Sequence, residues 1–129
     1  MRRRFTGNHD YVVITSASNS EVMTAMYANG LCANSSFMLK SECEKVSIAS
    51  LFKNSASILS AVKNFEEFKY FTNVSSLCYY NNNNTYNLFN SNTSLTSVTI
   101  PRSVTSIGTS AFYGCIHVAR FKIQTCVEN

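Results

Sequence analysis

The chain has 129 residues, of which 45% are hydrophobic and 14% are charged, and its formal net charge is +4. Ser, Thr and Asn together number 45, whereas Gly occurs four times and Pro once. This balance excludes a charge-driven disordered chain, the short apolar runs exclude a membrane-spanning segment, and the hydroxyl and amide side chains favour turns and strands over surface helices.

Residues 1–17 are predicted to be a basic N-terminal arm with at most partial order. Three positive charges lie at its start, on Arg2, Arg3 and Arg4, and without them eight positive charges face seven negative ones. Because no basic patch interleaved with aromatic residues follows, nucleic-acid binding is not expected. The polar residues after Arg4 argue against a secretory signal.

Residues 18–64 are predicted to be a helical region. Ser20 is a candidate N-cap for a helix over 21–28 that ends at Asn29-Gly30 and buries one face, formed by Met23, Met26 and Tyr27. Ser41-x-x-Glu44 has the spacing of a capping box and predicts a second helix through Ile48. A third helix is expected over 58–63.

An internal repeat follows, and its best copy is Leu95–Cys115, LTSVTIPRSVTSIGTSAFYGC. A shift of 23 residues superimposes Val118 on Leu95, Phe121 on Val98, Ile123 on Ile100 and Val127 on Val104. A shift of 30 in the other direction superimposes Phe65 on Leu95, Phe68 on Val98, Tyr70 on Ile100, Val74 on Val104 and Leu77 on Ile107. The seven-residue difference lies between Leu77 and Leu88, so the Asn-rich segment there is predicted to be a surface loop.

The spacing of each unit predicts a short strand followed by a return. Val98 and Ile100 alternate with polar residues, and Pro101 ends the strand because it lacks a backbone donor. Val104 and Ile107 supply a second inward pair. A coil this thin cannot bury both of its sides alone, so neighbouring units are expected to stack.

Leu95–Cys115 resembles the leucine-rich repeat of bacterial BspA-like surface proteins, whose units read L-x-x-V-x-I-P-x-S-V-T-x-I-G-x-x-A-F-x-x-C. The resemblance implies an α+β fold, with a short leucine-rich-repeat solenoid of small parallel strands preceded by an α-helical N-terminal cap over 18–64. Repeats are expected at about 65–94 and 95–117, with a truncated one at 118–129. The repeat register favours a strand at 65–70, whereas the segment before the first regular repeat tends to be helical in such proteins.

No enzyme template fits the sequence, so the protein is expected not to be an enzyme and to use no cofactor. The five cysteines form no C-x-x-C pair, and a Cys115–His117 nucleophile is disfavoured because Cys115 occupies a repeat position. No zinc site is predicted. Relatives of this region sometimes resemble half an EF-hand, but with Glu42 as the last ligand, Leu31 and Ala33 would stand where calcium needs oxygen donors.

The candidate interaction face is one exposed strip of the sheet, formed by Glu67, Lys69, Ser97, Thr99, Arg120 and Lys122. It is interpreted either as a mildly basic partner-binding surface or as a solvated sheet face. The resemblance implies a protein-interaction or adhesion module at the cell surface or secreted, with a protein or surface glycan as partner. The alternative is a truncated or vestigial intracellular or phage-encoded repeat protein that acts as a scaffold, and self-association through the incomplete last repeat is expected.

Overall fold

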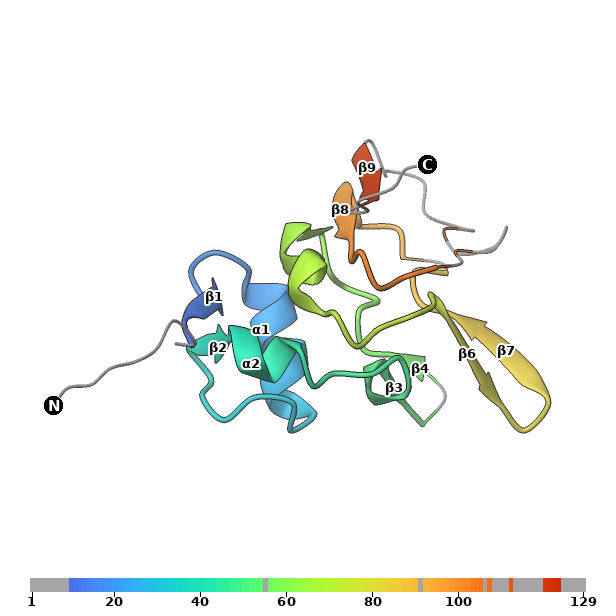
Figure 1. The fold of residues 1–129 in the computed structure, drawn as a ribbon, viewed down its shortest axis with the longest axis horizontal. Coiled ribbons are helices and arrows are strands. Elements are labelled where there is room, and N and C mark those ends of the chain that lie inside the picture. The colour runs from blue at the N-terminus through green and yellow to red at the C-terminus, as the bar shows by residue number, and fades with distance from the viewer. Residues whose placement is uncertain are drawn as a thin grey trace, which may run out of the picture.

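The computed structural model describes residues 10–54, 56–90, 92–105, 107, 112 and 120–123, the last four by their backbone only. The described residues form a mixed α+β fold with small sheets. The elements α1, α2, β1 and β2 gather at one end of the molecule, and the β6–β7 hairpin projects from the other end (Figure 1). One buried apolar core runs between these two ends.

Strand β1 (Val12–Thr15) begins the described structure and pairs antiparallel with β2 (Phe37–Leu39). Part of the region predicted as an arm is therefore a strand, and Ile14 is fully buried. The three arginines of that prediction lie outside the described residues.

Helix α1 (Ser20–Ala28) confirms the first predicted helix, with a different cap. The N-cap is Asn19, whose side chain accepts a hydrogen bond from the Val22 N–H. The helix ends at Asn29, and Gly30 adopts the left-handed φ of 73° that a glycine accommodates without strain. The core-facing residues include Met23 and Met26, but Tyr27 is half exposed, so its predicted place in the buried face was wrong.

The second predicted helix was wrong in extent, and the third was wrong in type. Helix α2 (Lys40–Cys43) is a single turn, and the carboxylate that caps it belongs to Glu42 and not to Glu44. Residues 58–61 form a turn, not a helix, because β4 (Ala56–Ser57) and β5 (Asn64–Phe65) stand directly on either side. Between them and α2 lie a 3-10 turn, η1 (Ala49–Leu51), and β3 (Phe52–Lys53), which pairs with β4.

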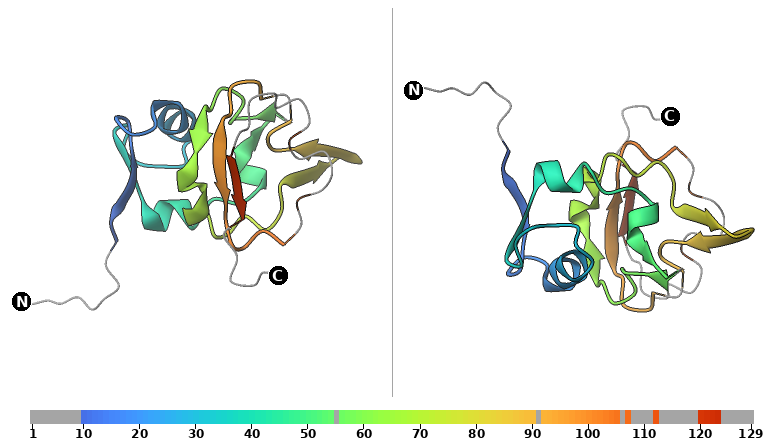
Figure 2. Two further views of the ribbon diagram at one scale, coloured as in Figure 1. Left: turned by 90° about the horizontal axis from the view of Figure 1, so that it is seen from above. Right: turned by 90° about the horizontal axis from the view of Figure 1, so that it is seen from below.

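A parallel sheet joins three distant segments in the order β5-β8-β9, with β8 at Ser97–Ile100 and β9 at Arg120–Ile123. The three strands lie side by side in both views of Figure 2. Val98 pairs with Phe121, which confirms the predicted 23-residue register. On the other side Val98 pairs with Phe65, a separation of 33 residues, so the predicted separation of 30 is wrong at the sheet.

The three-residue error has a local cause. After Phe65 the chain does not continue as a strand but forms the 3-10 helix η2 (Glu66–Tyr70), which packs against β8. Phe68, predicted to pair with Val98, lies in this helix with its ring stacked 4.8 Å from that of Phe65. One 3-10 turn contains three residues, the size of the displacement.

Beyond η2, equivalent residues of the two segments are again 30 positions apart in the sequence. The Val74 N–H donates to the Phe71 carbonyl, and the Val104 N–H donates to the Pro101 carbonyl at the same 3.1 Å. The two turns are linked, because the Thr105 N–H donates to the Ser75 carbonyl. The 30-residue correspondence therefore holds at these two turns and is displaced by three residues where β5 pairs with β8.

The predicted Asn-rich surface loop is a β-hairpin, formed by β6 (Cys78–Asn81) and β7 (Asn84–Asn87). Asn82 and Asn83 form its turn with φ values of 52° and 66°, as a two-residue type I′ turn requires. The hairpin leaves and rejoins the core at buried Leu77 and Leu88, joined by a 2.8 Å backbone hydrogen bond. The insertion was placed correctly, but its structure was not predicted.

Candidate functional site

The predicted interaction strip is only partly assembled. Ser97 and Thr99 on β8 pair with Arg120 and Lys122 on β9, as the 23-residue register predicts. Glu67 and Lys69 do not lie on the neighbouring strand but on η2. Asn64 takes the position beside Ser97 instead.

Thr99 is not available to a partner. It is 4% exposed, and its hydroxyl donates a 3.1 Å hydrogen bond to Glu66 of η2. The neighbouring Glu67 accepts a 3.0 Å hydrogen bond from the Asn19 side-chain amide at the start of α1. These polar groups therefore hold η2 against the sheet and the N-terminal helix, whereas Lys69 remains exposed. The side chains of Arg120 and Lys122 lie outside the described atoms.

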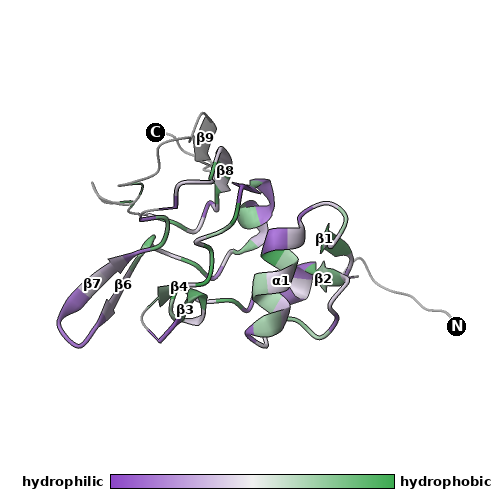
Figure 3. Ribbon diagram, turned by 180° about the vertical axis from the view of Figure 1, so that it is seen from behind, coloured by the Kyte–Doolittle hydropathy of each residue, from purple (hydrophilic) through white to green (hydrophobic). Residues whose placement is uncertain are grey.

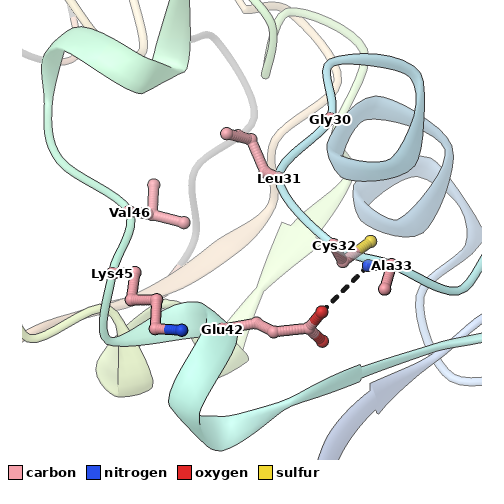
Figure 4. A pocket seen from close by; sticks show the side chains of 7 residues that line it. All are labelled: Gly30, Leu31, Cys32, Ala33, Glu42, Lys45 and Val46. Carbon is pink, nitrogen blue, oxygen red and sulfur yellow. Dashed lines mark hydrogen bonds between the residues drawn. The ribbon is translucent and has the colours of Figure 1, made fainter.

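A pocket of about 400 Å³ lies between the end of α1 and α2, and Figure 4 shows its lining. Both carboxylate oxygens of Glu42 bond to backbone N–H groups, that of Ala33 at 2.9 Å and that of Leu39 at 2.8 Å. Glu42 thus ties the loop after α1 to the beginning of α2. In the described part of the chain, no three His, Cys, Asp or Glu side chains are grouped as metal ligands would be.

The cysteines near this pocket are poorly suited to nucleophilic chemistry. Cys32 is 8% exposed and Cys43 fully buried. Burial, followed by the nearby Glu42 carboxylate, raises the pKa of the Cys43 thiol from 9.0 to about 12, and burial also raises the pKa of Cys32. A reactive cysteine needs the opposite shift. The Cys115–His117 pair lies outside the described residues.

The pKa of Cys43 predicts slow alkylation. At pH 8 a thiol with a pKa of about 12 is roughly one ten-thousandth thiolate, against about a tenth at a pKa of 9.0. We expect iodoacetamide to modify Cys43 at least about a hundredfold more slowly in the folded chain than in denaturant. Peptide mass spectrometry over time measures both rates, and equal rates would contradict the burial. Because the pKa of Cys43 is higher in the folded than in the unfolded chain, the folded state binds more protons above pH 9. The free energy of unfolding therefore falls as the pH rises from 9 towards 12.

The hairpin is the most exposed aromatic surface that the structure describes. At its base the Tyr79 ring stacks on Phe52 at 5.2 Å, and Tyr86 lies 6.2 Å from the same ring. Tyr80 is 76% exposed, and the tip is strongly hydrophilic (Figure 3). The sequence signal for this site was the presence of tyrosines on both sides of four consecutive asparagines, a segment that was interpreted only as a loop.

The described helices are all too short or too polar to span a bilayer. Comparison with protein-family models, with curated proteins and with solved structures finds no match for this chain.

Proposed function

We propose that this chain is a non-enzymatic interaction module of short stacked coils, similar to leucine-rich-repeat proteins, and that it binds a protein partner through the β6–β7 hairpin. The observation that carries the proposal is the exposure of Tyr80 on a hairpin fixed to the core at both ends. The proposed site replaces most of the predicted strip, since Thr99 is buried.

The packing of the predicted cap against the repeat region is supported by the polar contacts of one buried side chain. Asn92 is 1% exposed, and its amide nitrogen donates to the Leu59 carbonyl at 2.8 Å and to the Val62 carbonyl at 3.1 Å. Its oxygen accepts from the N–H group of Ser94 in its own unit and from that of Leu95, the first residue of the next unit. One side chain thereby satisfies backbone groups of the cap, of its own unit and of the start of the next unit, which is the kind of contact that a capped repeat needs.

The composition of the hairpin suits protein recognition. Residues 78–87 contain three tyrosines, five asparagines and no charged residue. Tyrosine supplies a large contact area at a low entropic cost, and asparagine supplies adaptable hydrogen bonds. The positive-φ turn and the packing of Tyr79 on Phe52 order the hairpin in advance, so little conformational entropy is lost on binding.

Site-specific photocrosslinking in the producing organism tests the proposal. A benzophenone amino acid replaces Tyr80 in one variant and Tyr27, which is 50% exposed on α1, in the control. We expect a discrete protein adduct from position 80 and none from position 27. Tyr80→Ala should then weaken binding of that partner by about tenfold or more, as a central aromatic contact does. Adducts of equal yield at both positions would contradict the assignment.

The alternative function is that of an intracellular or phage-encoded scaffold that associates with itself. It is favoured by β9, which pairs only with β8 among the described residues and so lies at the sheet edge. This alternative predicts that the mass measured by size-exclusion chromatography with light scattering rises with concentration. A strict monomer at high concentration contradicts it and leaves the hairpin proposal standing.

A further inference from the structure

Basic side chains from three separate segments converge on a second pocket. It has a volume of about 340 Å³ and is lined by Lys40, Glu44, Lys69, Tyr70, Thr72 and Arg102. Lys40 comes from α2, Lys69 from η2, and Arg102 lies two residues after the end of β8. The pocket therefore lies near the carboxyl end of β8.

Two of the three cations in this pocket have no carboxylate partner. Lys40 forms an ion pair with Glu44. Lys69 and Arg102 are exposed and form no ion pair with any carboxylate that the structure describes. The acidic residues nearest to Lys69 in sequence are engaged elsewhere, Glu66 with Thr99 and Glu67 with Asn19.

The geometry also places donors of several kinds around the same space. The Lys69 ammonium lies 5.4 Å from the centre of the Tyr70 ring, a cation–π contact that restricts the lysine. Thr72 and Tyr70 also line the pocket, and each carries a hydroxyl group that can donate a hydrogen bond. Arginine offers a planar set of N–H donors that matches phosphate oxygens, and lysine adds a compact charge. Three cations against one carboxylate leave the pocket with two uncompensated positive charges.

We propose that this pocket binds a phosphate group, either as a free anion or on a phosphorylated side chain. Lys69 and Arg102 would supply the charge, with Thr72 as a neutral donor. Glu44 opposes the ligand, both by its own charge and by occupying Lys40. The proposal is independent of the hairpin, because none of the residues that line the pocket belongs to β6 or β7.

Titration of the full chain followed by amide NMR tests the proposal, with inorganic phosphate as the probe and sodium chloride at matched ionic strength as the blank. We expect saturable shifts confined to the segments that carry the lining residues. Lys69→Ala combined with Arg102→Ala should weaken binding by about tenfold or more, since charge-assisted hydrogen bonds are lost. Lys53→Ala removes an exposed cation on β3 that forms no ion pair with the described residues, and it is the matched control, expected to change nothing.

Glu44→Gln provides a test that misfolding cannot imitate, because it should tighten phosphate binding by about threefold to fivefold. Blocked phosphoserine serves as a second probe: tighter binding than inorganic phosphate assigns the pocket to a phosphorylated side chain, and the reverse order assigns it to the free anion. Shifts that the double variant leaves unchanged, or that chloride reproduces, would overturn the proposal.

Discussion

Replacing Asn92 with alanine is expected to lower the free energy of unfolding by about 3 kcal/mol. The Asn92 side chain is 1% exposed and makes four hydrogen bonds, two of them to the carbonyls of Leu59 and Val62, about 30 residues earlier in the chain. Without it, the Val62 carbonyl and the N–H groups of Ser94 and Leu95 lose that partner inside the core. The Leu59 carbonyl retains a hydrogen bond from the Val62 N–H. Denaturant unfolding followed by circular dichroism measures the change.

Asn73→Ala is the matched control, since Asn73 is exposed in the turn before Val74. Its effect should stay within about 0.5 kcal/mol. Asn92→Asp keeps the shape and the acceptor oxygens but brings a carboxylate against two carbonyls, so it should destabilise the chain at least as much as alanine does. If all three variants unfold at the wild-type midpoint, Asn92 does not hold the turn at 59–62 against residues 92–95.

Replacing Phe68 with alanine should have the largest effect on stability, about 3–5 kcal/mol. Phe68 is fully buried, and its ring contacts those of Phe65, Phe71 and Phe89 at centroid distances between 4.8 and 5.8 Å. The truncation would open a cavity at the point where η2 meets the sheet. Thermal and denaturant unfolding measure the loss.

Tyr80→Ala removes an aromatic ring of similar size from the exposed face of the hairpin and is the comparison for Phe68→Ala. Because Tyr80 is 76% exposed, its loss should change the free energy of unfolding by less than about 0.5 kcal/mol. A comparable loss from the two truncations would mean that η2 does not cover the core as described.

The apolar pattern predicted the core positions better than the secondary structure that carries them. Leu59 and Val62 are buried as expected, although they lie in and beside a turn and not in a helix. Spacing identifies which side chains turn inward, but a short apolar run is compatible with a helix, a turn or a strand. Tertiary contacts then decide: Asn19 caps α1 because its amide also reaches the Asn64 carbonyl, at 2.9 Å and 45 residues away.

The candidate site was predicted less well than the core, for two physical reasons. The displacement at η2 moved Glu67 and Lys69 off the sheet, and alternation alone does not reveal a 3-10 turn. The hairpin was missed because four consecutive asparagines were taken as a loop, although Asn tolerates positive φ at both turn positions. The basic pocket brings together residues as far apart in the sequence as Lys40 and Arg102, which are separated by 62 positions. No sequence pattern predicts that such distant residues line one pocket.

The hydrogen bond between Leu77 and Leu88 has a consequence for how this molecule can change. Because this hydrogen bond already joins the two ends of the hairpin, residues 78–87 could be lengthened, shortened or exchanged with little effect on the buried core. Doubling the length of such a segment costs only about 0.6 kcal/mol in closure entropy. The segment between Leu77 and Leu88 is therefore a suitable place to insert other recognition sequences. It is also the place where related chains could differ in binding while keeping the same core.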